Sequence, residues 1–281
     1  MASRENPVSA RIFDPRRDSL VYIGEKANPA LWDSLWSLDA ATIGSVLAPS
    51  RDGDRIVNIT SRYLEPADGE ILEGGCGRGQ FVAALRRAGF RVIGIDYASA
   101  TVEALNLHAP ELDIRLGDLR SIPLPDASVS GYWSIGVIEH FWNGYDPLVQ
   151  EMARVVRPGG YLFCSFPFMN GLRALKARLG AYERREFGEE PEHFYQFALR
   201  HDEVVESLNR AGFSLVDSSR SSGLKGLLGE IAWIDSWFQR LYASESRSIA
   251  VRGIRKVCDA ALSMLGTPHS ILLVMRRNDT K

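Results

Sequence analysis

The sequence predicts an α/β fold in which helices cover both faces of a mostly parallel sheet. From about residue 67 onward, short apolar segments alternate with stretches of roughly 10–15 residues that have helical periodicity. This alternation is typical of βαβ units, in which crossover helices join parallel strands. A glycine-rich turn, residues 74–79, follows the first of these strands and precedes the first helix.

Residues 1–66 are interpreted as an N-terminal helical cap. Apolar residues at helical spacing predict a short helical element over residues 31–47, which carries Trp32 and Trp36. A second helix is predicted over residues 55–64, and Pro66 ends it.

The predicted core comprises residues 67–218 together with residues 270–281. Its strands are expected at residues 70–73, 91–95, 113–116, 129–135, 161–166, 213–216 and 271–275. Its helices are expected at residues 81–88, 99–107, 146–156 and 203–211. Glycines that follow two of these helices are typical of helix C-termini.

Two additions interrupt the alternation. Residues 169–200 are rich in arginine and glutamate and are interpreted either as a lid, with His193 and Tyr195 facing inward, or as a solvated charged helix. Residues 219–269 carry apolar and aromatic side chains at helical spacing and are interpreted as a helical insertion before the last strand. This insertion could pack on the core, cover an apolar acceptor, or form a homodimer interface through residues 224–265.

Composition excludes several classes of protein. Hydrophobic residues make up 45% and charged residues 24% of the 281 residues, as in folded globular domains. Lys+Arg number 33 and Asp+Glu 35, for a net charge of -2. Because duplex-binding domains usually carry a basic excess, nucleic acid is not expected as a partner.

Cysteine usage and hydropathy favour a cytoplasmic protein. Cys76, Cys164 and Cys258 are widely spaced and form no CxxC pair or Cys/His cluster, so neither disulfides nor zinc are indicated. The first residues lack the apolar segment of a signal peptide. The longest apolar run, residues 271–275, is far shorter than the roughly 20 residues that span a bilayer.

The glycine-rich turn predicts close approach of a ligand to the backbone at a helix N-terminus. A dinucleotide fingerprint needs glycines at i, i+2 and i+5. Counted from Gly75 the pattern fails at Gln80, and counted from Gly77 it fails at Val82. A nicotinamide-dependent oxidoreductase is therefore disfavoured.

Acidic residues stand at the ends of the first three predicted strands. Glu73 precedes the glycines, Asp96 ends the second strand and Asp118 follows the third. A carboxylate in the turn would repel a pyrophosphate but suits a ligand with an ammonium group. Asp96 is placed to accept hydrogen bonds from ribose hydroxyls, and Asp118 to meet an adenine edge. Three carboxylates around one crevice favour a cationic nucleoside.

With these motifs the chain resembles the class I S-adenosylmethionine-dependent methyltransferases, in particular the small-molecule type-11 branch. The matching segments occur in the family's order: residues 71–79, the strand ending in Asp96, and residues 117–119, 122–128, 134–140 and 157–160. They cover roughly residues 68–219 and the last strand. The resemblance implies a Rossmann-like seven-stranded sheet of order 3-2-1-4-5-7-6 with strand seven antiparallel. Ser130 and Gly131 depart from the family, which commonly has an acidic residue there.

The resemblance also implies that S-adenosylmethionine is the cofactor and S-adenosylhomocysteine its product. The implied cofactor-binding residues lie at the carboxyl ends of the first four strands: Glu73, Gly75, Cys76, Gly77, Gly79, Asp96, Tyr97, Asp118, Leu119, Ser134 and Ile135. Glu73 and the glycine turn would hold the methionine part, and Asp96 the ribose hydroxyls. Tyr97, Asp118 and the backbone of Leu119 would contact the adenine.

The acceptor side is less defined. Ser134 and Ile135 would line the floor beside the sulfonium, and His140 and Glu139 follow the strand end that faces the acceptor in the family. Methyl transfer is an in-line displacement in which positioning does most of the catalysis, and a base helps when the acceptor is a hydroxyl of high pKa. His140 is the candidate base, with a role in orienting the loop as the alternative. Glu139 is a second candidate or a helix-start carboxylate.

The sequence therefore predicts an enzyme that transfers a methyl group to a small-molecule or lipid-like acceptor, with oxygen favoured as the methylated atom. No metal site is expected, because residues 141–146 offer only Asn143 and Asp146 as ligands. The alternative is a catalytically silent, cofactor-binding scaffold subunit that acts through the aromatic helix predicted over residues 224–242.

Overall fold

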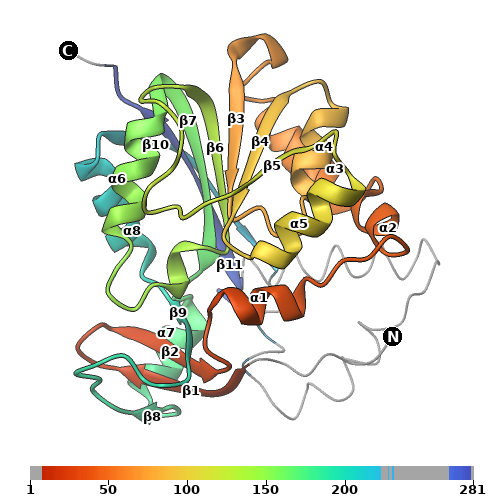
Figure 1. Ribbon diagram of the computed structural model, residues 1–281. Coiled ribbons are helices and arrows are strands. Elements are labelled where there is room, and N and C mark those ends of the chain that lie inside the picture. Colours follow the sequence, from red (N-terminus) through yellow and green to blue (C-terminus); the bar gives the residue numbers. More distant parts are fainter. Residues whose placement is uncertain (1–7, 223–226, 228–229, 231–265, 280–281) are drawn as a thin grey trace, which may run out of the picture.

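The computed structural model describes residues 8–222, 227, 230 and 266–279. A seven-stranded sheet occupies the centre of the molecule, and a four-stranded sheet lies beyond one end of its parallel strands (Figure 1). The predicted homodimer interface, the aromatic helix over residues 224–242 and most of the insertion over residues 219–269 fall outside the described residues.

The large sheet has the order β10-β11-β7-β6-β3-β4-β5. Its strands are β3 (Glu70–Gly74), β4 (Arg91–Asp96), β5 (Asp113–Leu116), β6 (Val129–Ile135), β7 (Val156–Pro167), β10 (Phe213–Ser221) and β11 (Ser270–Arg277). Strands β5, β4, β3, β6 and β7 are parallel, whereas β11 is antiparallel to both β7 and β10. The predicted order 3-2-1-4-5-7-6, with strand seven antiparallel, is confirmed.

Helices cover both faces of this sheet (Figure 1). The helices of the described chain are α1 (Pro29–Leu35), α2 (Ile43–Leu47), α3 (Arg51–Thr60), α4 (Gln80–Arg87), α5 (Ser99–His108), α6 (Asp146–Val155), α7 (Gly171–Arg178) and α8 (His201–Arg210). Short 3-10 turns are η1 (Pro66–Asp68) and η2 (Ile138–His140). Helices α3, α4 and α5 pack on one face, and α6 and α8 on the other.

The two faces of the sheet carry separate cores. Ile71 and Leu72 are neighbours on β3 and are fully buried, yet they belong to opposite clusters because successive strand residues point to opposite faces. Both faces of the central strands are therefore apolar, which is why the sequence shows continuous apolar runs there rather than alternation.

The four-stranded sheet corrects the interpretation of residues 1–66 as a helical cap. β1 (Val8–Asp14) and β2 (Ser19–Gly24) form an antiparallel hairpin, so helices occupy only the later part of that segment. The sheet, of order β8-β1-β2-β9, is completed by β8 (Glu183–Arg184) and β9 (Phe194–Ala198). The addition over residues 169–200 is thus not a solvated charged helix but α7 followed by two strands, and its interpretation as a lid stays a prediction.

Aromatic side chains attach this second sheet to the main core. The Trp142 ring lies 5.1 Å from that of Phe194 and 5.3 Å from that of Phe197, measured between centroids. Arg17 is on the β1–β2 connection, and its guanidinium lies 4.3 Å from the centre of the Trp142 ring. Val21, at the centre of β2, is fully buried in the same cluster. Part of the second sheet therefore packs into the hydrophobic core of α6 and α8, whereas Phe13, Leu20, Tyr22 and Ala198 form a separate cluster.

Truncation of Phe197 tests this attachment. Phe197 is only 4% exposed, so Phe197→Ala is expected to lower the free energy of unfolding by about 3–5 kcal/mol through lost burial and a residual cavity. Leu107 is 73% exposed, and Leu107→Ala is expected to stay within about 0.5 kcal/mol of the parent protein. Urea denaturation measures both, and equal costs for the two variants would contradict the docking of the small sheet.

Candidate functional site

The glycine-rich turn after β3 has a backbone that only glycine adopts readily. Gly75, Gly77 and Gly79 have φ angles of 77°, 48° and 70°. A Cβ atom on Gly75 would lie 2.6 Å from Cγ2 of Val137. The Gly75 and Cys76 N–H groups donate to the Ile95 carbonyl at 2.8 and 3.2 Å, which ties the turn to β4. The turn is therefore fixed by both conformation and packing.

Asp96 holds this turn from the end of β4. Its Oδ2 atom accepts a hydrogen bond from the Gly77 N–H at 2.8 Å, and its Oδ1 atom accepts one from the Ala98 N–H at 2.9 Å. Burial raises the pKa of Asp96, against the effect of these backbone donors. Because each carboxylate oxygen has two lone pairs, both oxygens can still accept another donor.

A cavity of about 100 Å³ lies at the carboxyl ends of the central strands. It is lined by Trp32, Trp36, Gly75, Asp96, Tyr97, Gly117, Asp118, Leu119, Arg120, Ile135, Gly136, Val137, His140 and Phe141. This is the edge of a parallel sheet at which ligands bind in open α/β folds, next to the point where the strand order reverses between β3 and β6.

Two tryptophans of the N-terminal segment cover the cavity. Trp32 on α1 and Trp36 at its C-cap stack with ring centroids 4.8 Å apart. Trp32 donates its indole N–H to the Tyr97 hydroxyl at 2.7 Å, and the Trp36 ring lies 3.4 Å from where a Cβ of Gly77 would be. Burial raises the pKa of Tyr97 to about 12, so its hydroxyl is protonated at neutral pH.

Helix α1 is fastened in this covering position by polar contacts. Asn28 caps its N-terminus by accepting from the Leu31 N–H at 2.9 Å. Asp33 accepts hydrogen bonds from the N–H and hydroxyl groups of Thr101, at 2.9 and 3.0 Å, on the neighbouring α5. The two indoles are therefore carried by a helix that is attached to α5 beside the cavity.

Asp118 follows β5 at the rim of the cavity and is paired with Arg120. The Arg120 guanidinium donates to the carboxylate at distances of 2.6 to 3.0 Å and lowers the pKa of Asp118. Asp113, at the other end of β5, is paired in the same way with Arg115 at 2.7 and 2.8 Å. Only Asp118 of these two carboxylates lines the cavity.

His140 reaches the cavity from η2, and its orientation is fixed by β9. Its Nδ1 atom lies 2.7 Å from the Tyr195 carbonyl oxygen. A carbonyl can only accept, so Nδ1 carries the proton and Nε2 keeps its lone pair. The ring also meets Trp32 and Tyr195 edge to face, with centroids 5.0 and 5.1 Å apart.

A β-bulge makes the Tyr195 carbonyl available. In the β2–β9 pairing Tyr22 opposes Gln196, but Ile23 opposes Phe194, so Tyr195 is the extra residue. Bulged residues leave the ladder of backbone hydrogen bonds and redirect their side chains. Tyr195 thus supplies both a carbonyl and a ring to His140.

Burial lowers the pKa of His140 to about 4, although the hydrogen bond to Tyr195 opposes this shift. The imidazole is therefore neutral at pH 7.

The structure separates the sequence-predicted residues into two layers. Those lining the cavity are Gly75, Asp96, Tyr97, Asp118, Leu119, Ile135 and His140. Those outside its lining are Glu73, Cys76, Gly77, Gly79, Ser134 and Glu139. Glu73 and Cys76 are 2% and 3% exposed, and burial raises the pKa of both groups well above the ordinary values.

The sequence reasoning missed Arg120, Val137 and the Tyr195 carbonyl. Arg120 and Val137 follow predicted strand ends by a few residues, which was a usable signal. The role of the Tyr195 carbonyl depends on a bulge in a sheet that was not predicted. Among the described residues, no three His, Cys, Asp or Glu side chains come together as a metal site would need. No described helix has the length and apolar character to cross a membrane.

Known proteins share this arrangement of motifs. A family model described as a methyltransferase domain matches residues 72–164. A Mycolicibacterium smegmatis protein named as a probable S-adenosylmethionine-dependent methyltransferase is 37% identical over 149 residues, which cover 53% of each chain. Residues 72–164 belong to a class I S-adenosylmethionine-dependent methyltransferase domain. The ubiquinone biosynthesis O-methyltransferase of Paracidovorax citrulli is 34% identical over 124 residues, 42% of this chain and 52% of that one.

The chain spans about half the length of these curated relatives. Among solved structures, the [4+2]-cyclase SpnF superposes with a TM-score of 0.54 at 21% identity, covering 92% of this chain and 99% of that one. This likeness shows that the two chains share a fold over most of their lengths. It does not identify the reaction, because that protein is a cyclase.

Asp118, which follows β5, and Asp113, at the start of β5, offer a matched test of the candidate cofactor site. Asp118→Asn is expected to weaken S-adenosylhomocysteine binding by about three- to tenfold, the scale of one ordinary hydrogen bond, because solvent screens the half-exposed Asp118 carboxylate. Asp113→Asn removes an equivalent arginine-paired carboxylate at the far end of the strand and is expected to leave the affinity unchanged. Calorimetric titration measures both, and equal effects would remove Asp118 from the site.

The histidine of the cavity is expected to titrate near pH 4 when its imidazole signals are followed by NMR, with His140→Gln identifying them. The unfolded chain binds this proton near pH 6.5 and the folded methyltransferase domain only near pH 4. Acidification through that interval therefore favours unfolding, by at most about 1.4 kcal/mol per pH unit from this group. An NMR midpoint near 6.5 would show that His140 is solvated rather than buried.

Proposed function

We propose that this protein transfers the methyl group of S-adenosylmethionine to an oxygen atom of a small-molecule or lipid-like acceptor. The observation that carries the proposal is one cavity in which the positive-φ glycine turn, the Asp96 carboxylate and a neutral His140 converge. The O-methyltransferase among the relatives supports oxygen as the methylated atom.

The residues present fit this cofactor. A Cβ on Gly75 would collide with Val137, so the glycine backbone borders the cavity without a side chain and leaves room for the methionine part. Asp96 has free lone pairs for the ribose hydroxyls, and Tyr97, Asp118 and Leu119 border the space for the adenine. Glu73 lies outside the cavity lining, with a buried carboxyl group. When bound, the cofactor supplies an electrophilic methyl group on a sulfonium.

The tryptophan cover controls access to this cavity. Its volume of about 100 Å³ is below the roughly 300–1,000 Å³ that small-molecule sites occupy, so entry requires the indoles to move. Trp36 packs directly on Gly77 and is the side chain whose displacement opens the turn. With the site filled, the stacked Trp32 and Trp36 exclude water from the reaction, which strengthens electrostatic interactions inside.

His140 orients the acceptor in this proposal. Its Nδ1–H is bonded to Tyr195, so Nε2 is the ring nitrogen that can accept a hydrogen bond from an acceptor hydroxyl. A pKa of about 4 makes this imidazole a weak base, which cannot hold a proton taken from an alcohol. The acceptor hydroxyl is therefore one acidic enough to give up its proton to water as the C–O bond forms and the S–C bond breaks, such as a phenol or an enol. His140 aligns its oxygen for in-line displacement.

Calorimetry with S-adenosylhomocysteine and NADH tests the cofactor. Micromolar binding of the nucleoside and none of NADH are expected. Asp96→Asn is expected to weaken nucleoside binding by about 10- to 150-fold, or ~1.5–3 kcal/mol, because it loses a charged acceptor and the anchor of the turn. A folded protein that binds no nucleoside, or an unaffected Asp96→Asn variant, would contradict the proposal.

A turnover assay distinguishes the proposed enzyme from the alternative, a catalytically silent scaffold subunit. Transfer of a labelled methyl group to any member of an acceptor screen would exclude a silent subunit. Tight nucleoside binding without turnover, together with obligate association with another protein, would favour it.

A further inference from the structure

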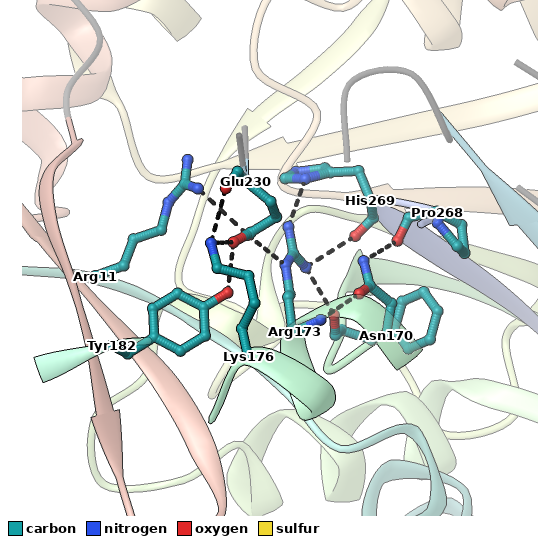
Figure 2. Close-up of polar contacts among 9 residues, drawn as sticks. Arg11, Asn170, Arg173, Lys176, Tyr182, Glu230, Pro268 and His269 are labelled. Atoms are coloured by element: carbon teal, nitrogen blue, oxygen red, sulfur yellow. Dashed lines mark hydrogen bonds and ion pairs between the residues drawn. The ribbon is translucent and has the colours of Figure 1, made fainter. Parts of the chain in front are cut away.

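A buried ionic cluster lies between the four-stranded sheet and α7, apart from the cofactor cavity (Figure 2). Glu230 is at its centre, with a fully buried side chain. Its carboxylate accepts from Arg11 on β1 at 3.3 Å, and from Arg173 and Lys176 on α7 at 3.1 and 2.9 Å. The Tyr182 hydroxyl donates to the same carboxylate. The cluster thus joins the hairpin to α7.

Among the described residues, the charges of this cluster do not balance. Three cations surround one carboxylate, which leaves a formal charge of +2 among these four described residues. Arg173 is 1% exposed and is otherwise satisfied, donating to the Phe168 carbonyl at 2.7 Å and to Nδ1 of His269 at 2.9 Å. Burying unpaired charge is costly, so the surplus needs either water or an anion.

The surplus lies on the side chains that solvent can reach. Arg11 and Lys176 are 25% and 24% exposed. Among the described residues, Arg11 donates a hydrogen bond through one guanidinium nitrogen only, and its other donors have no protein partner. Lys176 donates to the carboxylate and the carbonyl of Glu230, which leaves it one N–H.

A buried tyrosine completes this constellation. Tyr22 on β2 is 2% exposed, and its hydroxyl has no hydrogen-bond partner among the described residues. The Arg11 guanidinium lies 5.3 Å from the centre of the Tyr22 ring. A buried hydroxyl without a partner costs free energy, and a bound anion would satisfy it.

We propose that Arg11, Lys176 and the Tyr22 hydroxyl bind an acidic group of the methyl acceptor, a carboxylate or a phosphate. This inference rests on the proposed function and adds the chemical class of the acceptor. The same small sheet serves both ends of the reaction: β2 carries Tyr22, and its partner β9 carries the bulged Tyr195 that holds His140. Guanidinium groups with free N–H donors are the side chains best suited to carboxylate and phosphate.

The test titrates inorganic phosphate and acetate, in separate arms, into protein saturated with S-adenosylhomocysteine. Calorimetry is expected to show saturable binding of at least one anion. Tyr22→Phe is expected to weaken it at least fivefold, and Arg11→Gln at least tenfold. The arm that binds more tightly tells a phosphate group from a carboxylate in the acceptor.

Matched control variants show whether the cluster binds an anion or only stabilises the fold. Tyr132→Phe removes another fully buried hydroxyl without a described partner, and Arg16→Gln removes an exposed arginine that pairs with Glu186 in the same region. Neither is expected to change anion affinity. Melting temperatures of the tyrosine variants are expected to equal or exceed that of the parent, which shows that the loss is one of binding.

Two results would overturn the inference. One is no saturable binding of either anion while S-adenosylhomocysteine still binds, and the other is equal anion affinity in Tyr22→Phe and Tyr132→Phe. Failure of the folded parent protein to bind S-adenosylhomocysteine is a different outcome, because it contradicts the proposed function itself.

Discussion

The carboxylate of Asp96 is the constraint on which the site depends. It accepts one hydrogen bond from the glycine turn after β3 and one from the start of the segment that leads into α5. These hydrogen bonds join the ends of two neighbouring strands. They also hold the turn in which Gly75, Gly77 and Gly79 have positive φ angles. The tryptophan cover in turn packs on that turn and on Tyr97, next to Asp96 in sequence. The same side chain that can meet a ribose therefore also builds the cradle around it.

The large sheet was predictable because its information is local. Each parallel strand is a short apolar run bounded by a turn signal, and each crossover helix has its own periodicity, so the strand positions follow from local patterns. The order of the strands was implied by the resemblance to the methyltransferase family. The four-stranded sheet was not predictable in this way. Leu20 on β2 pairs with Ala198, far away in sequence, and β8 is only two residues long. No local pattern marks such a sheet, and charged neighbours disguise the hairpin of residues 8–24.

The candidate site was predictable in position but not in detail. Sequence spacing placed Gly75, Asp96 and Asp118 at one edge of a sheet, and the cavity lies there. Spacing does not tell which side chains of a turn point outward, and Glu73 and Cys76 point into the core instead. The tautomer of His140 was beyond sequence reasoning, because it follows from a bulge at Tyr195 that shifts the register of β2 and β9 by one residue.

The division of labour between the two sheets explains how one fold can serve different reactions. The large sheet supplies the glycine turn and the carboxylates, which the proposed function assigns to the cofactor. The small sheet is assembled from residues 8–24 and from β8 and β9, which lie outside the family match at residues 72–164, and it contributes the carbonyl that orients His140 and the cationic cluster. A cyclase shares the overall fold, so the fold alone does not specify the reaction. In the proposed arrangement, changes at Arg11, Tyr22 or the β9 bulge alter the acceptor while cofactor affinity stays the same.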